Sequence, residues 1–342
     1  MTSPSTTSFS SPPDTSPPSQ SDPLGSVRAA WSRLVGRRTS IFVVILLIVL
    51  LAAFGSIMSD RFRTISNAQN IWEQSTALAL VSLGQTMVIL AGGIDLSVGS
   101  LISLASVLLS GITNGDPGML VVAIFAVLAL GVLVGLVNGG VAIWLGVHPL
   151  IVTLGMGALL QGVTLLYTLK PAGSMPSGFD FLAYGRFLGL PIGAVATVIL
   201  FVLVALFLKY VPLGRLVYAI GDDETAAKLL GLPSVRVTLF VYAFSGLAAA
   251  LAAIFLVARF AVGQPYTGQN YTLASITPVV VGGTMLGGGR GGVIGTLLGV
   301  YLISLLNNLL NFTNISSYYQ LVIQGLIVIA AVSIYVDRKR RA

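Results

Sequence analysis

This 342-residue chain contains no cysteine, a single histidine and few charged residues, which make up only 8% of the sequence. The absence of cysteine excludes disulfide bonds and thiolate metal sites. The single histidine, His148, cannot form a multi-histidine metal site. Soluble domains carry about 25% charged residues, so this chain has too little polar surface to fold in water. We therefore expect a membrane protein without a metal centre.

Motifs for nucleotide binding and for hydrolytic catalysis are also missing. The glycine-rich segment GGTMLGGGRGG, residues 282–292, lacks the lysine followed by Ser or Thr that completes a phosphate-binding loop. Neither G-x-S-x-G nor H-E-x-x-H occurs. We expect no catalytic residues and no cofactor on this chain.

Apolar residues are abundant, at 55% of the sequence. A helix needs about 20 apolar residues to cross a bilayer. We predict an all-α multi-pass membrane protein with about ten transmembrane helices, including two short segments flanked by glycine. The predicted spans are 41–58, 68–91, 97–112, 118–145, 148–169, 191–210, 237–259, 272–286, 290–311 and 317–336.

The positions of Lys and Arg predict the orientation, because basic residues are retained on the cytoplasmic side. With ten spans, both termini and the loop 211–236 share one side and hold most of the basic residues. Both termini are therefore predicted to be cytoplasmic. We divide the chain into a disordered Ser/Pro-rich and then basic tail, 1–40, a transmembrane domain, 41–336, and a basic C-terminus, 337–342. This distribution of the net charge of +7 gives no reason to expect nucleic acid as a partner.

The loop 211–236 is predicted to contain a short cytoplasmic helix within GDDETAAKLLGL, residues 221–232. Acidic residues stand at its start and a lysine near its end, as the helix dipole favours. Gly231 and Pro233 together form a stop signal. The candidate residues are Asp222, Asp223, Glu224, Ala226, Lys228 and Gly231. The alternative is a capped connector without a partner.

The stretch AGGIDLSVGS, residues 91–100, places a carboxylate within the apolar sequence. Asp95 precedes an expected helix start, so it either caps that helix or forms a polar group at a substrate path or gate. Irregular backbone at membrane depth needs a cover of protein or of a water-filled cavity, so both roles place Asp95 inside a transporter. The path or gate candidates are Asp95, Ser97, Asn138, Asn307 and Asn308. For the asparagines, hydrogen bonding between helices is the alternative.

Glycines recur every four residues at Gly131, Gly135 and Gly139. Small residues at this spacing let helix backbones approach closely within a membrane. Glycines also recur every four residues from Gly283 to Gly299, but that stretch includes a predicted turn. For residues 283–292 we expect a hinge or half-helix junction.

Several blocks, in order, resemble a known family. They are GGIDLSVGS (92–100), GDDETAAKLLGL (221–232), VVVGGTMLGGGRGGVIGTLLG (279–299), LNNLLN (306–311) and SSYYQLVIQG (316–325). The chain resembles the permease subunit of ribose-type monosaccharide ABC importers, in the branched-chain amino acid/ribose permease superfamily. The resemblance extends from about residue 40 to the C-terminus.

The resemblance implies a ten-helix permease in the bacterial inner membrane that moves a monosaccharide, a ribose-like pentose or a hexose. The implied partners are a second permease copy or paralogue, an extracytoplasmic sugar-binding protein and ATP-binding cassette ATPase subunits that carry ATP and Mg. It also implies that 221–232 is the coupling helix that docks on the ATPase, with Glu224, Ala226 and Gly231 at matching positions. Asp222 and Asp223 depart from the small or amide residues expected there.

The alternative function is an ion-coupled secondary sugar carrier that acts without an ATPase. Ion coupling usually leaves several ionisable residues within the spans, whereas Asp95 is nearly alone there by our assignment. On the predicted outer side, Arg186 and Arg259 are candidates for docking the binding protein, because exposed charges steer protein encounters. Anchoring near lipid headgroups is the alternative for both arginines.

Overall fold

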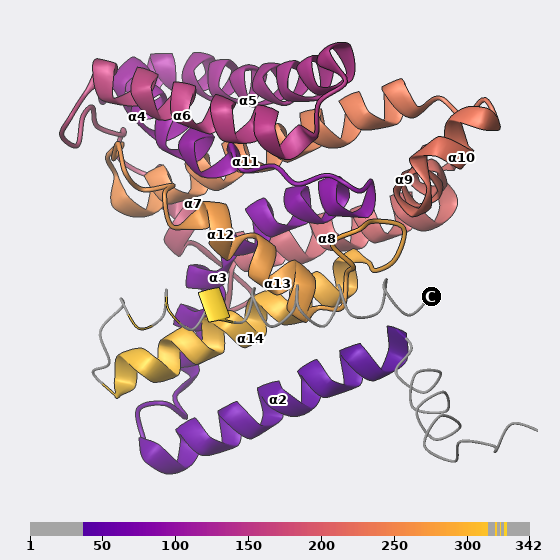
Figure 1. Cartoon of the computed structure of the whole chain (residues 1–342). Coiled ribbons are helices and arrows are strands. Elements are labelled where there is room, and N and C mark those ends of the chain that lie inside the picture. Colours follow the sequence, from indigo (N-terminus) through magenta and orange to yellow (C-terminus); the bar gives the residue numbers. More distant parts are fainter. Residues whose placement is uncertain (1–36, 314–318, 320–321, 323–324, 327–342) are drawn as a thin grey trace, which may run out of the picture.

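The computed structural model describes residues 37–313 together with residues 319, 322, 325 and 326 (Figure 1). The tail up to residue 36 and the C-terminus 337–342 lie outside the described residues. Of the tenth predicted span, 317–336, only the four single residues are described, so that span stays a prediction.

The described chain is mostly helical, and its strands form one two-stranded hairpin in which Arg186 pairs with Pro191. In chain order the elements are α2 (Arg37–Met58), α3 (Ile65–Leu90), α4 (Val98–Thr113), α5 (Pro117–Leu145), α6 (Pro149–Tyr167), α7 (Phe181–Tyr184), β1 (Arg186–Phe187), β2 (Leu190–Pro191), α8 (Ile192–Tyr210), α9 (Pro212–Asp222), α10 (Glu224–Leu229), α11 (Ser234–Phe260), α12 (Tyr271–Ala274), α13 (Ile276–Val281) and α14 (Val293–Phe312).

The first seven predicted spans and the ninth correspond to single helices whose bounds agree within a few residues. The predicted span 272–286 is wrong in extent, because it forms two short helices and ends at Val281. Two glycines, Gly282 and Gly283, follow, and Gly283 has a φ of +88°, which stops a helix. In the predicted cytoplasmic loop, α9 was not expected.

Local capping explains several of the helix starts. The Thr64 hydroxyl accepts a hydrogen bond from the Asn67 N–H at the start of α3. At the start of α5, the Asp116 carboxylate accepts one from the Gly118 N–H. Nδ1 of His148 accepts from the Leu150 N–H at 3.3 Å at the start of α6. The one histidine of the chain thus has a structural role in the described fold.

Two long helices, α3 and α11, form the centre of the bundle. α11 packs mainly on α5, α3 and α4, whereas α14 packs on α3, α13 and α2. In the most apolar part of α11, 72% of the residues are buried, compared with 11% in α2. α2 therefore lies at the periphery, as Figure 1 also shows.

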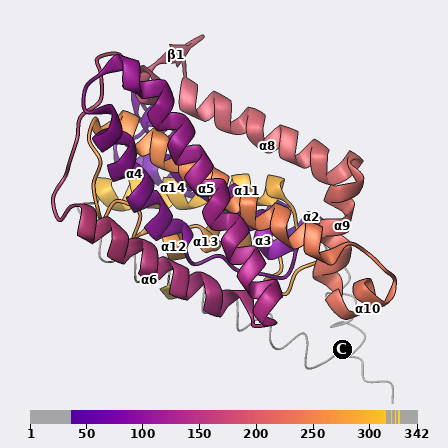
Figure 2. The same cartoon turned by 90° about the horizontal axis from the view of Figure 1, so that it is seen from above.

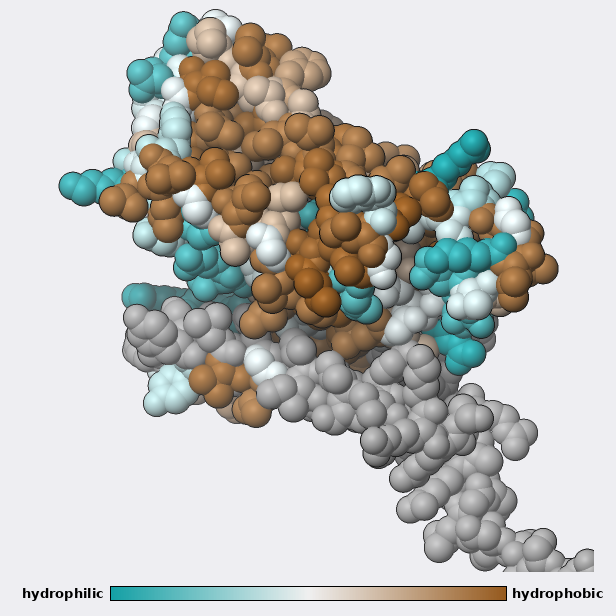
Figure 3. All heavy atoms as spheres, turned by 45° about the horizontal axis from the view of Figure 1, so that its top comes forward, coloured by the Kyte–Doolittle hydropathy of each residue, from teal (hydrophilic) through white to brown (hydrophobic). Residues whose placement is uncertain are grey.

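The helices run between two ends of the bundle. One end carries the β1–β2 hairpin and the other carries α9 and α10 (Figure 2). Hydrophobic side chains cover the middle of the face seen in Figure 3, and hydrophilic ones gather toward its two ends. Six of the described helices are long and apolar enough to cross a membrane, and two shorter apolar segments accompany them. The chain is a multi-pass membrane protein.

The glycine spacing on α5 produces close helix packing, as predicted. An added Cβ at Gly135 would overlap the carbonyl oxygen of Tyr242, and one at Gly131 would lie 2.5 Å from that of Gly246. The backbones of α5 and α11 therefore touch where a side chain would separate them.

Candidate functional site

The turn between α3 and α4, residues 91–97, is organised by Asp95, which is only 1% exposed. One carboxylate oxygen accepts hydrogen bonds from the Ser97 N–H at 3.0 Å and the Ser97 hydroxyl at 2.6 Å. The other accepts from the Ser245 hydroxyl of α11 at 2.9 Å. Asp95 therefore connects the start of α4 to the central helix α11.

Side chains from three further helices hold the same turn. The Asn138 amide of α5 donates to the Ser97 hydroxyl at 2.8 Å, and the Thr153 hydroxyl of α6 donates to the carbonyl of Ile94 at 3.2 Å. The side-chain amide of Gln85, on α3, bonds to the backbone of Asp95. Its nitrogen donates to the backbone carbonyl of Asp95, and its oxygen accepts from the backbone N–H of the same residue. The predicted candidates Asp95, Ser97 and Asn138 thus lie together in one buried network.

This geometry bears on both roles expected for Asp95, the helix cap and the gate. The residue before α4 is Ser97, and Asp95 accepts the N–H of Ser97 itself rather than one within the helix. Asp95 therefore stabilises the turn that leads into α4, from a position two residues before Ser97. Its burial means that any contact with substrate requires the turn to open.

The second irregular segment, 282–292, lies beside the first. The N–H of Gly289 donates to the carbonyl of Leu90, the last residue of α3, at 3.0 Å. Gly221, near the end of α9, sits between them, because an added Cβ there would overlap the Leu90 oxygen and lie 2.7 Å from the Gly289 nitrogen. Three segments that are far apart in sequence meet at one glycine.

The predicted cytoplasmic helix is present as α10, but it is shorter than expected and follows α9 directly. Asp223 is its cap, accepting from the Ala226 N–H at 2.9 Å, whereas Asp222 ends α9. Glu224 and Lys228 form an exposed ion pair at 2.8 Å. Gly231 has a φ of +71°, a left-handed conformation that commonly follows the end of a helix.

The α9 segment was missed although its sequence carries a signal. Pro212 stands at the first helical position, and the buried Gly214, Val217 and Ile220 follow at a spacing of three.

A cavity of about 430 Å³ lies between α10 and the 91–97 turn, and its lining includes Gly93 and Glu224.

The asparagines of α14 lie away from the Asp95 network. Asn308 exchanges two side-chain hydrogen bonds with Asn67 of α3, at 3.0 and 3.2 Å. This pair joins α14 to the start of α3, as expected if an asparagine hydrogen-bonds between helices. Asn307, its neighbour, is half-buried on the same helix.

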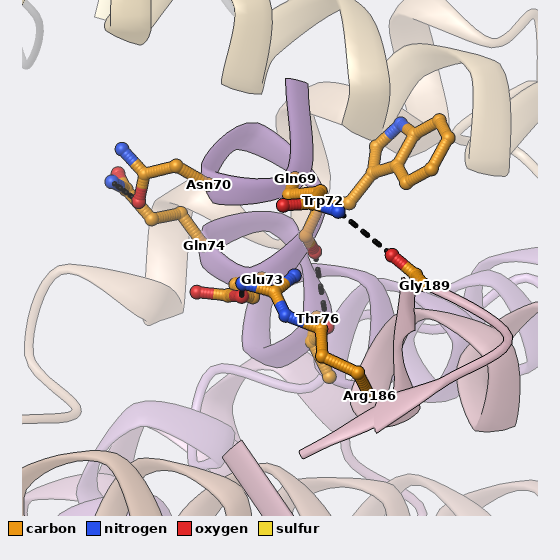
Figure 4. Close-up of polar contacts among 8 residues, drawn as sticks. All are labelled: Gln69, Asn70, Trp72, Glu73, Gln74, Thr76, Arg186 and Gly189. Atoms are coloured by element: carbon orange, nitrogen blue, oxygen red, sulfur yellow. Dashed lines mark hydrogen bonds and ion pairs between the residues drawn. The ribbon is translucent and has the colours of Figure 1, made fainter. Parts of the chain in front are cut away.

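At the end of the bundle opposite α10, Arg186 of β1 pairs with a buried carboxylate. Its guanidinium lies 2.7 Å from Glu73 Oε1 of α3 (Figure 4). Sequence reasoning overlooked Glu73, although an acidic residue inside the predicted span 68–91 was itself a signal. Arg259 is at the same end, where its carbonyl accepts from the Tyr184 hydroxyl at 3.1 Å.

Residues 67–332 match a family described as "Branched-chain amino acid transport system / permease component". The match covers well over half of the chain, including the Asp95 turn, α9, α10 and the glycine segment before α14. The chain belongs to this permease family. Permease components are transport components rather than enzymes, which agrees with the absence of catalytic motifs from the sequence.

Individual relatives match this permease over most of their length. The ribose import permease protein RbsC of Escherichia coli strain K12 is 38% identical over 86% of this chain and 92% of that protein. RbsC of Bacillus subtilis strain 168 is also 38% identical, over 84% and 89%. The D-allose transport system permease protein AlsC of Escherichia coli strain K12 is 33% identical over 84% and 89%. No solved structure matches the chain significantly.

Proposed function

We propose that this permease is the membrane-spanning subunit of an ATP-binding cassette importer that moves a monosaccharide across the bacterial inner membrane. The observation that carries the proposal is the 38% identity to ribose import permeases over nearly their whole length. The D-allose relative extends the substrate class to hexoses. The expected partners are ATPase subunits that carry ATP and Mg, a second permease subunit and an extracytoplasmic sugar-binding protein.

The proposed topology has ten spans with both termini in the cytoplasm. Its support is the position of α9 and α10 at one end of the bundle, with the basic residues Lys209, Arg215, Lys228 and Arg236 nearby in sequence. Basic loops favour the cytoplasmic side. The opposite end, with Glu73 and Arg186, then faces outward.

In the proposed mechanism, α10 docks on the ATPase and transmits its movement inward. A six-residue helix is marginal alone in water and needs a partner surface to hold it. Because α9 precedes α10 directly, a displacement of α10 moves Gly221. Gly221 contacts both the end of α3 and the segment before α14, so the movement reaches the turn that Asp95 organises.

Reconstitution tests this function. In liposomes, the chain together with the ATPase and binding protein of its transport system should take up D-ribose or D-allose only when ATP is present. Co-purification of an ATPase subunit with the chain is the simpler first measurement. Uptake by the chain alone, driven by an ion gradient, would establish the secondary-carrier alternative instead.

The docking role of α10 predicts a specific mutant phenotype. Glu224→Lys should reduce ATP-dependent uptake severalfold at normal membrane abundance, because it reverses the charge at the start of the helix. The double variant Glu224→Lys/Lys228→Glu keeps an ion pair within α10 and is the matched control. If the double variant recovers full uptake, the ion pair within the helix matters rather than a contact with the ATPase.

A further inference from the structure

A polar pocket of about 450 Å³ lies where α3 begins, at the end of the bundle opposite α10. Its volume lies within the range of pockets that hold small ligands. Besides two hydroxyl side chains, its lining consists of Arg61, Asn67, Asn70, Glu73, Arg186 and Phe312. The lining comes from the start of α3, from the residues before it, from β1 and from the end of α14.

Glu73 is the central group of this pocket. It is 93% buried within a helix of the membrane bundle, and its carboxylate pairs with Arg186 at 2.7 Å. Only the carboxylate is buried, because the side chain of Arg186 is 40% exposed. An ionisable residue within the membrane region is therefore a functional candidate by default.

Asn67 is bonded to Asn308, but two other residues of the lining, Asn70 and Arg61, have accessible polar groups. Asn70 is half-buried one turn before Glu73, and its side-chain oxygen accepts from Gln74 at 2.8 Å (Figure 4). Among the described residues, the guanidinium of Arg61 has no ion-pair partner. The pocket thus offers carboxylate acceptors beside guanidinium and amide donors.

This set of groups suits a neutral ligand with many hydroxyls. Each hydroxyl both donates and accepts, so adjacent hydroxyls can bind Glu73 and Arg186 at the same time. The buried carboxylate repels anions and the two arginines repel cations. Phe312 supplies an apolar wall for the carbon skeleton.

We propose that this pocket is an outer sugar site, at which a monosaccharide binds after its release from the binding protein. The inference rests on the proposed function and names Glu73 and Arg186 as the binding groups, with Asn70 in the lining beside them. Binding is weak, since a site on a transport path must also release its ligand.

The absence of cysteine from the chain makes the test direct, because one introduced thiol labels without background. Asn70→Cys places the thiol in the pocket, and Gln74→Cys places it on α3 outside the pocket lining. Each full-length variant in nanodiscs is treated with a charged maleimide, with and without D-ribose, D-allose or D-fructose at tens of millimolar. Betaine, which has no hydroxyl group, controls at the same concentration for general solute effects.

At least one of these sugars should slow labelling of Asn70→Cys about threefold, since a site filled two thirds of the time is open for one third. Labelling of Gln74→Cys should not change. Adding Glu73→Gln to Asn70→Cys should remove the protection. The double variant should then label at the same rate with sugar as without it. Size-exclusion chromatography and the Gln74→Cys rate report whether the Glu73→Gln background is folded. If it is not, Arg186→Lys takes its place.

The inference is overturned if no sugar slows labelling of folded Asn70→Cys, or if protection survives both substitutions. It is also overturned if sugar-free binding protein alone protects as well as sugar, because the pocket is then a docking surface. ATP-dependent uptake by the wild-type importer, measured separately, tests the proposed function. Uptake without protection refutes only the pocket, and protection without uptake refutes only the importer.

Discussion

Two irregular segments interrupt the helices at the α10 end of the bundle, and they are held by opposite means. The 91–97 turn is held by side chains, chiefly Asp95, which receives three hydrogen bonds. The 282–292 segment is held by backbone contacts at glycines, of which Gly288 and Gly289 have φ of +85° and +70°. The Gly289 N–H donates to the carbonyl of Leu90, the residue before the 91–97 turn, so the two segments are adjacent.

The difference shows two ways of placing irregular backbone inside a membrane. Polar side chains can satisfy the free N–H and C=O groups of a turn, as around Asp95. Glycine instead lets another backbone come close enough to do so, at the cost of leaving no space for a side chain. The first kind of segment should be sensitive to the loss of charge and hydrogen bonds, and the second to added volume.

The largest effect is expected from Gly221→Val. The new side chain would overlap the Leu90 carbonyl and the Gly289 backbone, so overpacking should cost about 3 kcal/mol or more and separate the segments. We expect loss of uptake and a lower unfolding temperature in detergent. Gly162→Ala on α6, where an added Cβ meets nothing within 4 Å, is the control and should behave as wild type. Wild-type uptake by Gly221→Val would mean that the three segments are not held together at this glycine.

The extent of most of the long helices could be predicted from the sequence, because a long apolar run must be a helix in lipid. Their tertiary contacts could not. Nothing near Gly221 in GDDETAAKLLGL indicates that it touches Leu90, 131 positions earlier in the printed sequence. Contact between distant backbones leaves no local pattern beyond the glycine itself.

The candidate site was predicted in part, for a similar reason. Asp95, Ser97 and Asn138 were identified because polar side chains are rare in apolar spans, and they do lie together. Ser245 and Gln85 were missed, since a serine or glutamine in a helix is unremarkable until its partner is known. Glu73 was missed although the same rarity argument applied to it.

The next largest effect is expected at Asp95. Asp95→Ala leaves two hydroxyls and one N–H without their acceptor, which should cost about 3 kcal/mol. Asp95→Asn retains a carbonyl oxygen and should cost about 1 kcal/mol. Denaturant unfolding in detergent measures the stability difference, and uptake measures its consequence. Equal and severe loss of uptake in both variants at normal expression would show instead that the charge itself is required, as in a gate.

The smallest effect is expected from removing a side-chain hydrogen bond in the glycine segment. The Thr284 hydroxyl is buried and accepts from the Gly292 N–H at 3.2 Å, so Thr284→Val should cost about 1 kcal/mol by leaving that N–H unpaired. Thr164→Val on α6 is the matched control, because the Thr164 hydroxyl only donates to the Leu160 carbonyl, which keeps its helical bond. If unfolding experiments show that Thr284→Val costs as much as Asp95→Ala, the 282–292 segment depends on side chains after all, and the contrast between the two segments fails.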